Sequence, residues 1–165
     1  TKIGNLEGCK ILDYGCGTGA LAGYLKKNKI NVDYYGCDIV DEALIIAKHK
    51  FPECHFGYFE DFFSEQFDYI FISGVFNNKL DDNVAYYEEI LKKLFPLTKK
   101  GIAFNMMSTY VDYYDEMLYY ENPERIFTYI KQSLTPYITI RNDYLVKSDV
   151  NVPFEFSVYA YKRGN

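Results

Sequence analysis

The stretch ILDYGCGTGALAGYL, residues 11–25, joins a short apolar run to a glycine-rich turn and an apolar helical pattern. Gly15, Gly17 and Gly19 form the turn. Asp13 stands just ahead of them, at the end of the apolar run. Glycine lets the backbone approach a ligand closely, and the start of a helix presents free N–H groups and a partial positive charge. The stretch therefore predicts a strand, a glycine turn and a helix whose first residues bind an anionic group.

Strand and helix patterns alternate along the rest of the chain. Expected strands span Cys9–Tyr14, Val32–Asp38, Cys54–Phe59, Phe67–Ser73, Gly101–Met107, Tyr137–Tyr144 and Phe154–Tyr161. Expected helices span Ala20–Lys27, Asp41 to Pro52, Asp81 or Asp82 to Pro96, and Pro123–Leu134. The short link 147–153 between the last two strands permits a hairpin but no crossover helix. We therefore expect an α/β fold with a doubly wound, mostly parallel seven-stranded sheet and an antiparallel C-terminal β-hairpin.

The composition is typical of a globular protein. The 165 residues suit a single domain, which we expect to span 1–165. A net charge of −5 argues against a nucleic-acid or anionic-membrane partner. No apolar run approaches the roughly 20 residues of a membrane span. Four cysteines without CxxC spacing predict reduced core thiols in a cytoplasmic protein, and no metal site. The sequence carries no signal for an oligomeric state.

Two ligands compete for the glycine turn. The spacing of Gly15, Gly17 and Ala20 also fits a variant of the dinucleotide-binding fingerprint. Asp13 would repel a pyrophosphate, whereas it would attract the ammonium group of S-adenosylmethionine. Asp38, at the end of the second expected strand, can accept both hydrogen bonds of a ribose cis-diol and suits either ligand. The acid ahead of the turn therefore favours S-adenosylmethionine.

The motif 13–19, DYGCGTG, resembles the first motif of class I S-adenosylmethionine-dependent methyltransferases. The segment 35–39, YGCDI, is similar to the second-strand signature of this family, and FDYIFIS at 67–73 looks like its fourth strand. The closing pair of strands matches the family's antiparallel hairpin. The resemblance implies S-adenosyl-L-methionine as cofactor and S-adenosyl-L-homocysteine as product. The family usually has helical sequence before the first strand, so we expect an upstream lid segment to be missing here.

The resemblance also implies which residues bind the cofactor. They follow the first four strands: Asp13, Tyr14, Gly15, Cys16, Gly17 and Gly19; Asp38 and Ile39; Glu60, Asp61 and Phe62; Ser73 and Gly74. After the third strand the family often carries Gly-Asp, but here Gly57 precedes a tyrosine. We expect Asp61 to take the place near the adenine amino group, with Glu60 as the next candidate.

The acceptor is expected to bind at the loops after the fourth and fifth strands. The segment after Ser73 lacks the Asn/Asp-Pro-Pro-Tyr/Phe motif of enzymes that methylate amide or base nitrogens. We therefore expect a small-molecule acceptor, with methyl transfer to a hydroxyl of a sugar or another metabolite. Asp112 is the candidate general base, and Asn77 and Asn105 are candidate positioning residues. The alternatives are a cofactor-binding module without activity, truncated or regulatory, and a NAD(P)-binding oxidoreductase.

Overall fold

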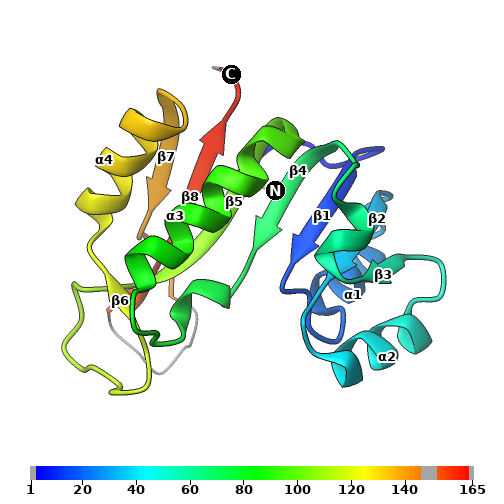
Figure 1. The fold of residues 1–165 in the computed structure, drawn as a ribbon, viewed down its shortest axis with the longest axis horizontal. Helices are drawn as coiled ribbons and strands as arrows, with labels where there is room; N and C mark the ends of the chain where they lie inside the picture. Colours follow the sequence, from blue (N-terminus) through cyan, green and yellow to red (C-terminus); the bar gives the residue numbers. More distant parts are fainter. Residues whose placement is uncertain (1–2, 146–151, 164–165) are drawn as a thin grey trace.

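One mixed sheet runs through the protein (Figure 1). The computed structural model describes residues 3–145 and 152–163, and within these ranges eight strands and four α-helices follow one another. The strands are β1 (Lys10–Tyr14), β2 (Asp33–Cys37), β3 (His55–Gly57), β4 (Phe67–Ile72), β5 (Thr98–Ser108), β6 (Tyr120–Glu121), β7 (Tyr137–Arg141) and β8 (Glu155–Tyr161). The helices are α1 (Ala20–Lys27), α2 (Asp41–Lys50), α3 (Asn83–Leu94) and α4 (Pro123–Ser133), with 3₁₀ helices η1 (Phe59–Phe62), η2 (Val75–Asn77) and η3 (Phe95–Leu97).

The strand order confirms the expected topology. It is β3-β2-β1-β4-β5-β8-β7, with the short β6 paired to β5 off this path. β1 pairs in parallel with both β2 and β4, so the winding reverses at β1. β8 pairs antiparallel with both β5 and β7. The sheet is therefore doubly wound and mostly parallel, with an antiparallel C-terminal pair. Of the expected link 147–153, positions 147–151 lie outside the described residues.

Polar caps determine where two of the helices begin. The Asp82 carboxylate accepts a hydrogen bond from the Ala85 amide at 2.9 Å at the start of α3. The Asn122 side chain accepts from two amides at the start of α4, and Pro123 occupies the first helical position, where its missing N–H is not needed. In the described part of the chain, no helix has the length and apolarity that a membrane span requires.

The structure adds short elements that the sequence patterns did not predict. The two-residue β6 pairs with β5 through Met107 and Ser108. The third strand ends at Gly57, earlier than expected, because the next residue already caps η1: the Tyr58 amide donates to the Asp61 carboxylate at 2.9 Å. The local hydrogen bond of a turn therefore replaces the last strand pairing there.

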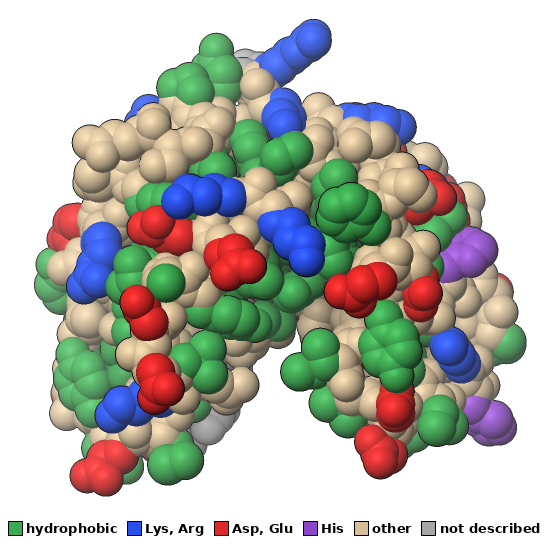
Figure 2. Space-filling model, in the orientation of Figure 1, with side chains coloured by type: hydrophobic (Ala, Val, Ile, Leu, Met, Phe, Trp, Pro, Cys, Tyr) green, Lys and Arg blue, Asp and Glu red, His purple; other side chains and the backbone are tan. Residues whose placement is uncertain are grey.

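Alternation along β1 divides the hydrophobic core between the two faces of the sheet. Leu12 belongs to a cluster beneath α3 and α4, which lie in front of the sheet in Figure 1. Its neighbour Ile11 belongs to a second cluster with residues of α1 and α2. Both side chains are fully buried. Helices thus cover both faces, and the carboxyl ends of the parallel strands meet at one edge, where such folds bind their ligands. Figure 2 shows that the molecule is hollowed between two lobes at this edge.

The four cysteines are free thiols. Cys9, Cys16 and Cys37 are buried, and Cys54 is half-buried. Burial raises the pKa of the Cys16 thiol to about 12, which keeps it protonated. Within residues 3–145 and 152–163, no three His, Cys, Asp or Glu side chains gather in the way a metal ion would require.

Replacement of Gly101 tests the packing of the central strands. Gly101 lies in β5 between β4 and β8, and a Cβ atom there would approach the Ala160 carbonyl oxygen to 2.5 Å. Because this neighbour is backbone of a paired strand, it cannot rotate away. We expect Gly101→Ala to lower the free energy of unfolding by about 1–3 kcal/mol, measured by chemical denaturation. The nearby exposed Lys99→Ala is the control and should change it by less than about 0.5 kcal/mol. Equal stability of the two variants would contradict this packing.

Candidate active site

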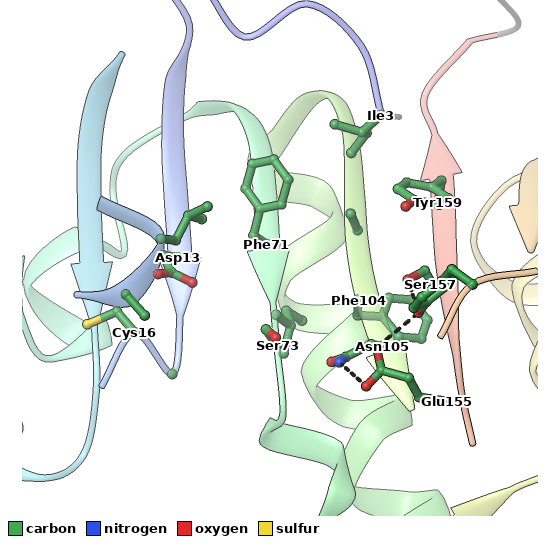
Figure 3. Close-up of a pocket in the computed structure, with 16 residues that line it drawn as sticks. Ile3, Asp13, Cys16, Phe71, Ser73, Phe104, Asn105, Glu155, Ser157 and Tyr159 are labelled. Carbon is green, nitrogen blue, oxygen red and sulfur yellow. Dashed lines mark hydrogen bonds between the residues drawn. The ribbon is translucent and has the colours of Figure 1, made fainter. Parts of the chain in front are cut away.

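Two cavities open at the carboxyl ends of the strands. Gly15 and Ser73 line both, so the cavities meet at the ends of β1 and β4. The first, about 510 Å³, is named here the β2 arm; its lining includes Tyr14, Asp38, Ile39, Tyr58, Glu60 and Gly74. The second, about 520 Å³, is named the β8 arm; its lining includes Asp13, Cys16, Phe71, Asn105, Glu155 and Tyr159 (Figure 3). Together the arms form one elongated site across five strands.

The turn between β1 and α1 has the backbone conformation that its glycines predict. Gly15, Gly17 and Gly19 have φ angles of 76°, 52° and 83°, which residues with a Cβ atom rarely adopt. At Gly15 a Cβ atom would also lie 2.3 Å from the Val75 side chain. Ala20, the first residue of α1, lines the β8 arm. The partial positive charge at the start of this helix therefore acts on the cavity.

Asp38 connects the end of β2 to the glycine turn. Its Oδ2 accepts a hydrogen bond from the Gly17 amide at 2.8 Å, and its Oδ1 accepts from the Val40 amide at 3.0 Å. An ionised carboxylate has about four acceptor positions, so each oxygen can still accept another hydrogen bond. Ile39, which follows, is 91% exposed and lines the same arm. The β2 arm thus contains a fixed carboxylate beside an apolar surface.

Asp13 is the buried acid of the β8 arm. It is 5% exposed, and its Oδ2 accepts a hydrogen bond from the Tyr34 hydroxyl at 2.5 Å. The pKa of Asp13 is raised to about 6: burial is the largest cause, the Tyr34 hydrogen bond opposes the rise, and the negative charge of Asp38 adds to it. A group with a positive charge beside Asp13 would lower this pKa and be held by the ionised carboxylate. The sequence analysis did not identify Tyr34 as part of the site.

The three expected residues after the third strand have different surroundings. Glu60 lines the β2 arm. Asp61 belongs to neither lining, and its Oδ2 accepts the Tyr58 amide. Phe62 is buried in the core, with its ring edge-on to Tyr35. The structure therefore brings Glu60, rather than Asp61 or Phe62, to the cavity.

The expected residues after β4 and on β5 meet where the two arms join. Ser73 lines both arms, and Gly74 lines the β2 arm. The Gly74 amide donates to Asn105 Oδ1 at 2.8 Å, and Asn105 lines the β8 arm. Asn77 lines neither arm; its Oδ1 accepts the Met107 amide at 3.2 Å and so fastens η2 to β5.

The structure does not bring Asp112 together with the other predicted site residues. Its side chain is exposed in the loop between β5 and β6, and it belongs to neither cavity lining. The tyrosines of this loop pack locally: the Tyr110 hydroxyl donates to Glu124 on α4 at 2.7 Å, and the Tyr114 ring contacts that of Tyr120. The role of Asp112 as a general base stays a prediction.

The sequence analysis missed a group of lining residues at the far end of the β8 arm. Glu155, Ser157 and Tyr159 alternate along β8 and therefore share one face of the sheet, and Tyr144 lies beside them. The available signal was the alternation in EFSVYAY, where the residues between them are buried. That pattern predicts a strand with one buried face, but it does not show that the other face lines a cavity.

The fold is that of class I methyltransferases. Against an Archaeoglobus fulgidus SAM-dependent methyltransferase the TM-score is 0.72 at 18% identity, with 96% of this chain and 88% of that chain covered. Against magnesium protoporphyrin IX methyltransferase (ChlM) from Synechocystis PCC 6803, solved with bound SAM, it is 0.70 at 16% identity, with 96% and 72% covered. Plantazolicin methyltransferase BpumL has a TM-score of 0.67 at 17% identity, with 93% and 76% covered.

Sequence comparison identifies the family. The family described as "Methyltransferase domain" matches residues 5–143. Over 145 residues the chain is 30% identical to Rv1506c of Mycobacterium tuberculosis (strain ATCC 25618 / H37Rv), which is named as a methyltransferase. That match covers 81% of this chain and 86% of the relative. The chain therefore belongs to the methyltransferase domain family, and the expectation of a methyltransferase is confirmed.

The raised pKa of Asp13 predicts a pH dependence of stability. In the unfolded chain the Asp13 carboxyl has its ordinary pKa of 3.8, whereas in the folded chain its pKa is about 6. Its contribution to stability is therefore present at low pH and is lost as pH rises through about 6. We expect the unfolding free energy of the wild type, relative to Asp13→Asn, to fall by about 2 kcal/mol between about pH 4 and pH 7. Denaturation curves across this range measure the difference. Parallel pH profiles of the two proteins would contradict the pKa shift.

Proposed function

We propose that the chain transfers a methyl group from S-adenosyl-L-methionine to a hydroxyl of a small molecule, a sugar or another hydroxylated metabolite, in the cytoplasm. The observation that carries this proposal is the elongated site with an acid in each arm, Asp38 in one and Asp13 in the other. S-adenosylmethionine carries a ribose diol in its adenosine part and an ammonium group at its amino-acid end, and each of the two acids suits one of these groups.

The β2 arm suits the adenosine part of the cofactor. Asp38 is held by two backbone amides and retains acceptor positions for both ribose hydroxyls. Tyr14, Ile39 and Tyr58 supply aromatic and apolar surface for a flat base. Glu60 is the acid that lines this arm, and it is therefore the better candidate for the adenine amino group than Asp61.

The part of the β8 arm nearest the glycine turn suits the amino-acid end. Asp13 would hold the ammonium group, and the start of α1 at Ala20 would attract the carboxylate. Gly15 lets the backbone pass close to the ligand where the arms meet. When bound, the cofactor supplies an activated methyl group, so the protein's main contribution is to orient the acceptor.

The shared fold does not determine the acceptor. Two of the similar solved structures are named as methyltransferases of magnesium protoporphyrin IX and of plantazolicin, which are chemically unrelated molecules. The acceptor of this chain must therefore be inferred from its own cavity. Of the residues expected to act on the acceptor, Asn105 lines the β8 arm, whereas Asn77 and Asp112 do not.

Isothermal titration with S-adenosylhomocysteine tests the cofactor assignment. We expect S-adenosylhomocysteine to bind to the wild type with micromolar affinity, and we expect NADH not to bind. Asp38→Ala should weaken S-adenosylhomocysteine binding by roughly tenfold or more, because it removes hydrogen bonds to a charged acceptor. Asp33→Ala, which removes an exposed acid from the other end of β2, is the matched control and should leave binding unchanged. Binding of NADH, or equal affinities of the two variants, would overturn the assignment.

The pH dependence of the same binding tests the ammonium site. If Asp13 has a pKa of about 6 in the free protein, only about a tenth of it is ionised at pH 5. We expect S-adenosylhomocysteine to bind roughly tenfold more weakly at about pH 5 than at about pH 7.5. Methylthioadenosine, which lacks the amino-acid end, should show no such change. Equal pH profiles for the two ligands would place the ammonium group away from Asp13.

A further inference from the structure

The far wall of the β8 arm carries an acid that the cofactor assignment does not use. Glu155 begins β8, and Asp13 lies near the end of β1 on the other side of the cavity, as Figure 3 shows. β4 and β5 lie between their strands. Three strand spacings of ~4.8 Å separate these two strands by about 14 Å. The β8 arm is thus wide enough to hold a second molecule beside the amino-acid end of the cofactor.

Neighbouring side chains fix the position of the Glu155 carboxylate. Asn105 Nδ2 donates to Glu155 Oε2 at 3.0 Å, and the Tyr144 hydroxyl lies 3.0 Å from Oε1 (Figure 3 shows the first of these bonds). The Tyr144 oxygen also lies 2.6 Å from Ser157 Oγ. Each carboxylate oxygen therefore has one neutral hydrogen-bond donor and keeps room to accept another. Such a group is a prepared acceptor for an O–H group.

The rest of this wall selects against an anionic ligand. Phe71, Ala103 and Tyr159 give it aromatic and apolar surface. The described residues that line the β8 arm include no Lys or Arg, and they include two acids, Asp13 and Glu155. With Asp13 assigned to the ammonium group of the cofactor, a phosphate or carboxylate there would still meet the negative charge of Glu155 with no lysine or arginine in the described lining to balance it. An uncharged molecule with a hydroxyl group would be accepted.

We propose that Glu155 is the acceptor-binding residue, which takes the hydrogen bond of the hydroxyl on an uncharged acceptor seated against Phe71 and Tyr159. This inference rests on the proposed function and deepens it, because it assigns the acceptor site and the charge class of the acceptor. It also replaces Asp112 as the acid that contacts the acceptor. Asn105 is then a positioning residue, since it acts by holding the Glu155 carboxylate.

Three probes with one aromatic ring test the proposal on protein saturated with S-adenosylhomocysteine. Phenol donates a hydrogen bond, anisole is its methyl ether and cannot donate, and benzoate is anionic. NMR titration gives each affinity, and contacts to Tyr144 and Tyr159 locate the bound ring. We expect phenol to bind in the β8 arm several-fold more tightly than anisole, and benzoate to bind most weakly.

Matched variants assign the preference to one carboxylate. Glu155→Gln keeps the shape but removes the charge, and we expect the several-fold preference for phenol over anisole to be lost. Asp112→Asn should keep the wild-type preference. An unchanged melting temperature and S-adenosylhomocysteine affinity show that the Gln variant is folded. If that variant does not fold, the order of the three probe affinities in the wild type and the location of the bound ring still decide whether the proposal holds.

Several outcomes would overturn the proposal. They are equal binding of phenol and anisole, tighter binding of benzoate, a preference that survives in Glu155→Gln or is lost in Asp112→Asn, or no probe in the β8 arm. The cofactor assignment fails separately, if S-adenosylhomocysteine does not bind to the wild type. In that case the probes are titrated into the free protein, and the order of their affinities still tests whether Glu155 binds the hydroxyl group.

Discussion

The hydrogen bond from the Gly17 amide to the Asp38 carboxylate joins the ends of two neighbouring strands, and the site is built around it. The amides of Gly15 and Cys16 both donate to the Cys37 carbonyl, so the whole turn after β1 is fastened to the end of β2. This attachment requires a backbone that curls back within a few residues, which the positive φ angles of the glycines allow. It also fixes the spacing of Asp13 and Asp38, which lie at the ends of β1 and β2 nearest the cavity. The two arms of the cavity therefore keep one geometry relative to each other.

The sequence was sufficient for the fold because its signals are local. The apolar run before the glycines, the Asp82 and Asn122 caps and the alternation in the final strand each involve a few adjacent residues. The place of Asp38 at the ligand edge could be predicted for the same reason, since the residue that follows a parallel strand lies at that edge. The Tyr34 contact to Asp13 could not, because it depends on the register of β1 against β2. Register depends on both paired segments, so neither segment alone determines it.

The acids after β3 show how a local hydrogen bond can override a positional expectation. The family resemblance pointed to Asp61 in the place of the usual acid, but its side chain turns back to the Tyr58 amide and belongs to neither cavity lining. In a 3₁₀ helix successive residues are rotated by about 120°, so adjacent acids face different directions. Glu60 consequently lines the cavity, while Phe62 fills the core. Sequence position alone could narrow the choice of the cavity acid to Glu60 and Asp61. Only the direction in which the turn points each side chain distinguishes them.

The two arms are coupled through the amide of one side chain. The backbone N–H of Gly74 can only donate, so it requires the oxygen of Asn105, and the amide nitrogen must then face Glu155. This chain of bonds runs from the β2 arm, through the loop after β4, to the far wall of the β8 arm. A ligand that moves the Gly74 loop would therefore also change the donor available to Glu155. The acceptor wall thus depends on the loop that the cofactor contacts, although β4 and β8 are far apart in the sequence and are separated by β5 in the sheet.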